Sequence, residues 1–197
     1  MRHVADVITD CATVCFYDPY ALPIDFIEQW YADVQGYFDR VSRQGLLWFT
    51  TSNADGLYRT EFYVGEDPPP AALLDAVPLP WMPKLMIPSG IVCVASPEGI
   101  FGANDLDDLP TRERLPTDRF EPGCVFCVEP GDYDVISWAF DRSDETRYDP
   151  SVPSTQYGPD FVVQLKRFAP TPLPVPAGRC RNLAEGGFYA PCIFPEN

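Results

Sequence analysis

The sequence predicts a mainly β fold, namely an antiparallel β-sandwich with one covering amphipathic helix and a Pro/Gly-rich C-terminal tail. Several short stretches with alternating apolar residues are separated by turn residues. Only one stretch has helical periodicity, and 197 residues that are 46% hydrophobic suffice for one core. We therefore expect a sandwich domain over residues 1–169, with residues 170–197 packed on it as an extension.

The covering helix is predicted near residues 24–43. Pro23 fits its first turn and Gly45 a position just past its end. Gly36 weakens the prediction by about 1 kcal/mol relative to alanine. The apolar residues that recur at helical intervals are Phe26, Ile27, Trp30, Tyr31, Val34, Tyr37, Phe38 and Val41.

The strands are predicted in the order of the chain. "TVCFYDP" is a short strand, and "LLWFTT" and "LYRTEFYVG" form a hairpin around "SNADG". "EDPPPAALLDAVPLPWMPKL" is too rich in proline for a central strand and is expected to be a connection that ends in an edge strand. "MIPSGIVCVAS" contains a strand that follows a Pro-Ser-Gly turn, and "FVVQLKRF" is the last firm strand.

The stretch "GCVFCVEPGDYDVISWAF", residues 123–140, is predicted to be a second hairpin that reverses at Pro130, Gly131 and Asp132. In a strand, Cys124 and Cys127 would point to opposite faces, which argues against a zinc or redox site. The seven cysteines have irregular spacing, so we expect reduced thiols and no metal or cofactor.

The charge of the chain limits its partners. The 29 acidic residues outnumber 14 basic ones, which gives a formal net charge of −15 and a pI near 4.2. Such a protein is repelled by nucleic acids and anionic membranes and attracts a basic protein. Because we find no membrane-spanning apolar stretch and no secretory leader, a cytoplasmic location is expected.

Enzymatic chemistry has few residues to build on. His3 is the only histidine, and we expect it to belong to a mobile terminus, which argues against acid–base or nucleophilic catalysis with histidine. The glycine-rich phosphate-binding motifs are missing from the sequence. A hydrolase that uses only carboxylates is the least supported reading, so a non-enzymatic protein is expected.

The order of the motifs resembles that of ComJ-like competence proteins, small bacterial β-sandwich proteins that include a nuclease inhibitor. The similar segments are "VQGYFDRVSRQGLLWF", "MIPSGIVCVAS", "FCVEPGDYDVISWAF" and "YGPDFVVQLKRF". The resemblance implies a β-sandwich and a broadly inhibitory role, and it implies no functional residues. The matching positions are Gln35, Gly36 and Tyr37, then Pro88 and Gly90, then Pro130, Gly131 and Tyr133.

Charge and resemblance together predict an acidic binding protein that neutralises a basic nuclease, or a cognate antibacterial toxin as an immunity protein does. Residues 98–160 contain 15 acids and five arginines, a local excess that would steer a basic partner. Tyr157 is a further candidate aromatic contact. The candidate partner-binding residues are Asp105, Asp107, Asp108, Asp141, Asp144, Glu145, Tyr148 and Asp149.

A carbohydrate- or small-ligand-binding sandwich is the alternative. In this interpretation, exposed tryptophans would form a stacking surface for the ligand, whereas buried ones would belong to the core. The four tryptophans are Trp30, Trp48, Trp81 and Trp138.

Overall fold

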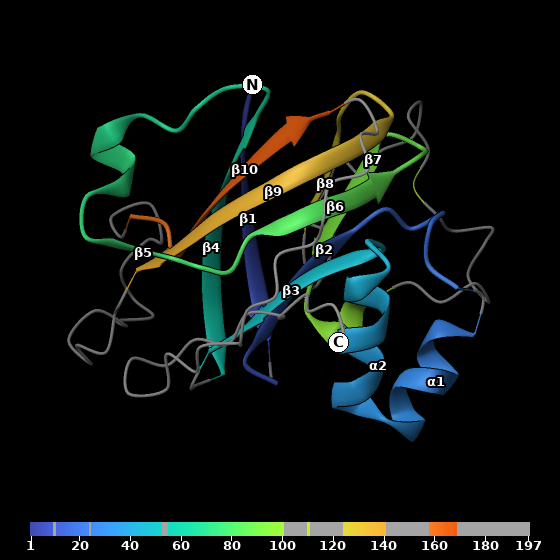
Figure 1. Ribbon diagram of the computed structural model, residues 1–197. Coiled ribbons are helices and arrows are strands. Elements are labelled where there is room, and N and C mark those ends of the chain that lie inside the picture. The colour runs from blue at the N-terminus through green and yellow to red at the C-terminus, as the bar shows by residue number, and fades with distance from the viewer. Residues whose placement is uncertain are drawn as a thin grey trace, which may run out of the picture.

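The computed structural model describes residues 1–9, 11–23, 25–52, 55–100, 110, 124–140 and 158–168. These residues form two sheets and a pair of helices, which confirms the mainly β prediction (Figure 1). Sheet A has the order β1 (Arg2–Thr9), β4 (Gly56–Val64), β10 (Phe161–Arg167) and β9 (Gly131–Phe140), and β5 (Ala76–Pro78) and β6 (Met82–Ile87) both pair with β9. Sheet B has the order β3 (Leu47–Thr51), β2 (Thr13–Tyr17), β7 (Ile91–Ala95) and β8 (Cys124–Cys127).

The pairing within the sheets is antiparallel, as predicted, except between β4 and β10, which run parallel with Thr60 opposite Phe161. The predicted strands in "TVCFYDP", "MIPSGIVCVAS" and "FVVQLKRF" are β2, β7 and β10. The proline-rich connection contains the short 3₁₀ helix η1 (Pro70–Leu73) and ends in β5 and β6 at the edge of sheet A, as expected. A second 3₁₀ helix, η2 (Pro97–Gly99), follows β7.

Both predicted hairpins are wrong, because each turn carries the chain from one sheet to the other. β3 lies in sheet B and β4 in sheet A, and likewise β8 lies in sheet B and β9 in sheet A. The short connections from β1 to β2 and from β6 to β7 also cross between the sheets. Turn residues such as Gly131 reverse the chain equally well in a hairpin and in a crossover, so the local pattern does not reveal which sheet the next strand joins.

Two apolar clusters account for the layers. One lies between the sheets and includes Phe16, Trp48, Phe62 and Val163. The other lies between sheet B and the helices α1 (Phe26–Ala32) and α2 (Val34–Arg43), which cover its outer face (Figure 1). Sheet A therefore has one face in the core, and its outer face is not covered by these helices.

The predicted helix is divided into α1 and α2 at Asp33, whose φ of −157° is extended. Asp33 caps α2, because its Oδ1 accepts a hydrogen bond from the Gly36 backbone N–H at 3.2 Å. A Cβ at Gly36 would lie 2.5 Å from Asp33 Oδ2, which explains the glycine that had weakened the prediction. Gly45 follows the end of α2 with a φ of +76°, as predicted for a residue just past a helix.

The expectation of a mobile N-terminus is wrong, because His3 lies in β1. Its ring stacks on Phe126 with a centroid distance of 4.2 Å. The alternation of β1 was hidden because apolar residues occupy both faces, with Val4 and Ile8 outward and Val7 in the core. Residues 170–197 lie outside the described residues, so their packing stays a prediction.

Candidate protein-binding face

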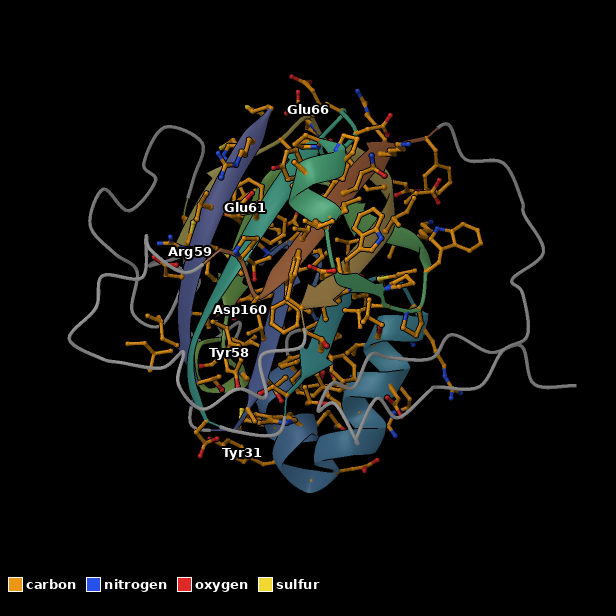
Figure 2. All side chains as sticks on the ribbon, turned by 90° about the vertical axis from the view of Figure 1, so that its left-hand side faces the viewer. Tyr31, Tyr58, Arg59, Glu61, Glu66 and Asp160 are labelled. Carbon is orange, nitrogen blue, oxygen red and sulfur yellow. The ribbon has the colours of Figure 1, made fainter. Side chains whose placement is uncertain are left out.

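The outer face of sheet A, on the side away from sheet B, carries charged side chains in register across two strands. Ala5 and Val7 of β1 point into the core, so Asp6 and its even-numbered neighbours point outward. The pairing places Asp6 opposite Arg59 of β4, and Arg2 opposite Tyr63. Figure 2 views this face, with Glu61 and Arg59 on β4 and Glu66 just past its end.

Arg59 and Asp6 form a bidentate ion pair. Arg59 Nε donates to Asp6 Oδ1 at 2.8 Å, and Nη2 donates to Oδ2 at 2.9 Å. The two side chains are only 15% and 19% exposed. The hydrogen bond with the Asp6 carboxylate raises the pKa of Arg59, so the guanidinium is held firmly in its charged form.

Asp160 lies beside Arg59 and connects the end of β9 and the start of β10 to β4 (Figure 2). Asp160 Oδ2 accepts a hydrogen bond from the Arg59 backbone N–H at 2.6 Å, and the Asp160 backbone N–H donates to the Arg59 carbonyl at 2.7 Å. The Phe140 N–H donates to the Asp160 carbonyl at 3.0 Å. Asp160 thus fixes the position where the chain leaves β9 and enters β10.

Glu61 is a buried carboxylate on the same face, and its oxygens are occupied by hydrogen bonds. Arg2 donates to both oxygens, with Nε 3.2 Å from Oε2, and the Tyr63 hydroxyl donates to Oε2 at 3.0 Å. The hydrogen bond to Glu61 raises the pKa of Arg2. Because these bonds saturate Glu61, we regard it as a residue that orders the face rather than as an acid–base group.

The carboxylates of this face also engage the lysines of sheet A. Lys166 Nζ lies 2.8 Å from Asp67 Oδ1, and Lys84 Nζ lies 3.0 Å from Asp132 Oδ2. Other carboxylates have no such partner, since the exposed Asp25, Glu28, Asp55, Asp75 and Glu129 form no ion pair with a described residue. The described part of the surface therefore keeps its negative charge.

The strand directions place both predicted acidic segments at one end of the sandwich. We call this the β1–β2 end, because β1 runs into β2 there and β3 runs into β4. β7 is antiparallel to β2, so it finishes at this end and β8 starts from it. β10 is parallel to β4 and antiparallel to β9, so β9 also finishes here and β10 starts here. The two segments that contain the candidate partner-binding residues, 102–123 and 141–160, therefore both leave the sheets at this end, and we call them the two acidic stretches.

The predicted partner-binding residues themselves are not placed by the structure. Of the second acidic stretch, the structure describes residues 158–160. The following candidates lie outside the described residues: Asp105, Asp107, Asp108, Asp141, Asp144, Glu145, Tyr148, Asp149 and Tyr157.

The cysteine pair has the predicted geometry. Cys124 packs against the cluster between the sheets, and Cys127 packs against the cluster beneath the helices. The two thiols thus lie on opposite faces of β8. Burial raises the pKa of Cys124 to about 11, which disfavours the thiolate that redox chemistry and metal binding require.

The tryptophans do not form one stacking surface. Trp48 belongs to the cluster between the sheets and Trp30 to the cluster beneath the helices, so both are core residues. Trp81 is 37% exposed, and Trp138 is half-buried on the outer face of sheet A. At most two of the four tryptophans are therefore accessible to a ligand.

Sequence reasoning missed the ordered charges of β1 and β4. The alternation in "RHVADVIT" and "LYRTEFYV" contains the signal, because Arg2 and Asp6 fall on the same face of one strand and Arg59 and Glu61 on one face of the other. The register that brings them together could not be predicted, because β1 and β4 are joined through sheet B.

Comparison with known proteins finds two solved structures that are similar to this chain. No family model matches the sequence, and no curated protein matches it. The structure described as "Crocagin biosynthetic gene J" is similar at 20% sequence identity with a TM-score of 0.56, over 85% of this chain and 98% of that chain. The crystal structure of ComJ from Bacillus subtilis, an inhibitor of the DNA-degrading activity of NucA, is similar at 8% identity with a TM-score of 0.44, over 85% of this chain and 96% of that chain.

The first likeness shows the fold. Among the described residues, no helix has both the length and the apolar character needed to cross a membrane.

Proposed function

We propose that this chain is a non-enzymatic acidic binding protein that neutralises a basic partner, either a nuclease or a cognate antibacterial toxin. The kind of partner is suggested by the ComJ-like resemblance, since ComJ is described as an inhibitor of a DNA-degrading protein. The basic character of the partner follows from the net charge of −15, because opposite charge accelerates encounter and selects among partners.

The observation that carries the proposal is the shared origin of the two acidic stretches. β7 and β9 both finish at the β1–β2 end, so both stretches, which contain most of the candidate residues, are tethered to one end of the sandwich. Carboxylates tethered to one end produce a stronger local field than the same charges spread over the surface. We expect Asp105, Asp107, Asp108, Asp141, Asp144, Glu145 and Asp149 to contact the partner, with Tyr148 as an aromatic contact.

The absence of enzymatic activity is part of the proposal. His3, the single histidine, is stacked on Phe126 in the sheet, and Glu61 is saturated by Arg2 and Tyr63. Neither residue offers the accessible proton-transfer group that acid–base catalysis requires.

The proposal is tested in two steps. The immobilised chain is exposed to lysate of its own host at low and high salt, and a retained basic nuclease or toxin is identified by mass spectrometry and purified. Its dissociation constant is then measured between 50 and 500 mM salt. We expect the affinity to fall steadily with salt and the partner's activity to be inhibited. An affinity that does not depend on salt would contradict the proposal.

Two matched variants test which carboxylates contribute to binding of the partner. One neutralises Asp141, Asp144, Glu145 and Asp149 as amides, and the other changes Asp25→Asn, Glu28→Gln, Asp75→Asn and Glu129→Gln. The two variants have equal net charge, so general electrostatics affects both alike. We expect the first variant to bind at least about tenfold more weakly than the second at 50 mM salt. Equal losses would show that the second acidic stretch has no special role.

A further inference from the structure

Exposed apolar side chains form a small surface on the outer face of β1 and β4. Val4 and Ile8 of β1 are 42% and 57% exposed, and both point outward. Leu57, which is half-buried, lies opposite Ile8 in the antiparallel pair. We call Val4, Ile8 and Leu57 the β1–β4 apolar surface. The β-branched side chains of Val4 and Ile8 are stiff, so ordering them on contact with a partner costs little side-chain entropy.

The Arg59–Asp6 ion pair makes this surface rigid. Asp6 lies between Val4 and Ile8 on the same face of β1, and both of its oxygens bind the guanidinium of Arg59. The backbone of Arg59 is held in turn by Asp160. Side chains fixed in this way need little rearrangement on binding, which favours affinity through preorganisation.

The charge around the surface is negative. Asp6 and Asp160 flank the cation Arg59, and Glu61 pairs with the cation Arg2. Asp55, which is exposed, precedes β4 at the β1–β2 end. Leu74 and Val77 are also exposed apolar residues, at the far edge of sheet A. They lie across sheet A from β1, beyond β10 and β9, so they provide control positions outside the proposed contact.

We propose that the β1–β4 apolar surface is the docking surface for the basic partner, with Ile8 and Leu57 at the centre of the contact and Asp6, Asp55 and Asp160 around them. An apolar centre with a charged rim is the usual arrangement of a protein interface. The proposal rests on the proposed function, since it names the place where that partner binds. A second copy of this chain is a poor occupant, because two chains of net charge −15 repel each other.

The test uses paired substitutions of opposite charge at Ile8. The probe is the purified basic nuclease or toxin identified above, and the variants of the full chain are Ile8→Glu and Ile8→Lys, with Leu74→Glu and Leu74→Lys as matched controls. We expect both Ile8 variants to weaken binding at least about tenfold, because each buries a charge at the centre of the contact. We expect the Leu74 variants to stay within about threefold of the unchanged chain.

The outcomes separate this proposal from the proposed function. If the unchanged chain binds no basic protein in a salt-dependent manner, the proposed function fails. If it does bind, but the Ile8 variants keep full affinity, only the docking surface is wrong. A stronger affinity for Ile8→Glu would also overturn the docking surface, because charge alone would then explain binding. A dimer of the chain that Ile8→Lys dissociates would overturn it as well, because the surface would then belong to the contact with a second copy. Val4→Glu, with circular dichroism to verify folding, repeats the test at a second position.

Discussion

The buried carboxylate of Asp18, just after β2, binds Ser89 in the crossover between β6 and β7. Asp18 Oδ2 accepts hydrogen bonds from the Ser89 backbone N–H at 2.7 Å and from its hydroxyl at 2.8 Å, and Oδ1 accepts one from the Tyr20 N–H at 2.9 Å. This carboxylate therefore connects sheet B to the turn that brings the chain over from sheet A.

Replacement of Asp18 by alanine should lower the free energy of unfolding by about 3 kcal/mol, because it leaves several buried donors without an acceptor. Asp18→Asn should cost less, since its amide oxygen still accepts a hydrogen bond. Urea denaturation followed by tryptophan fluorescence measures both values. Asp25→Ala is the control, because Asp25 is not buried and its side chain makes no hydrogen bond at the N-cap of α1. A loss for Asp18→Ala no larger than for this control would contradict the structural role.

His3 should make the stability depend on pH. Burial lowers the pKa of His3, and its Nε2 has no hydrogen-bond partner among the described residues. Below the ordinary histidine pKa of about 6.5, the unfolded chain therefore binds a proton that the folded chain does not, and stability falls as the pH falls. The slope is at most about 1.4 kcal/mol per pH unit until the folded protein also takes up the proton.

The measurement is the free energy of unfolding between pH 7.5 and 5 for the unchanged chain and for His3→Phe, which keeps a ring to stack on Phe126. All other titrating groups are shared, so the difference between the two curves isolates His3. We expect that difference to grow as the pH falls. Parallel curves would mean that the His3 ring reaches water in solution.

The Arg59–Asp6 pair should contribute more than an ordinary surface ion pair. Most exposed pairs contribute less than 1 kcal/mol, but this one is bidentate and only 15% and 19% exposed. A double-mutant cycle with Arg59→Ala and Asp6→Ala should give a coupling free energy of about 1 to 2 kcal/mol. Arg59→Lys should recover only part of it, because an ammonium group cannot form the two parallel bonds. A coupling near zero would show that the pair does not make the β1–β4 apolar surface rigid.

The sequence predicts the strands of this protein better than the sheets that they join. Apolar alternation and turn residues correctly indicated β2, β7 and β10, since these signals are local. The choice of sheet is not local, because a crossover such as that at Gly131 uses the same residue types as a hairpin. In this fold, short turns carry the chain from one sheet to the other, and long connections return it to the sheet that it left. A short turn between two strands usually indicates the opposite, namely a hairpin within one sheet.

The candidate site was predictable only in its charge. Composition indicates a basic partner, and the acidic stretches stand out in the sequence because they lack periodicity. The ordered pairs Arg59–Asp6 and Arg2–Glu61 depend on the register between β1 and β4, which are nearly 50 residues apart in the chain. Nothing in the sequence of β1 or β4 alone indicates that the two strands pair with each other.

Gly90 and Gly65 offer a matched test of the crossover between β6 and β7. Both have a positive φ, +75° and +71° respectively, which alanine adopts at a cost of about 1 to 2 kcal/mol. A Cβ at Gly65 would meet nothing within 4 Å, whereas a Cβ at Gly90 would lie 2.6 Å from the Val128 carbonyl oxygen. Val128 lies in the crossover between β8 and β9, and its backbone N–H donates to the Gly90 carbonyl at 2.8 Å. The two crossovers therefore cannot separate without losing this bond.

Gly65→Ala should therefore lower the free energy of unfolding by about 1 kcal/mol, and Gly90→Ala by about 2 kcal/mol more, since it adds a clash with a hydrogen-bonded backbone to the same strain. Urea denaturation of the two variants gives the difference directly, and the strain common to both cancels. Equal losses would show that the crossover at Gly90 moves away from Val128 at little cost. In that case, the β6–β7 crossover and the β8–β9 crossover are not packed against each other in solution.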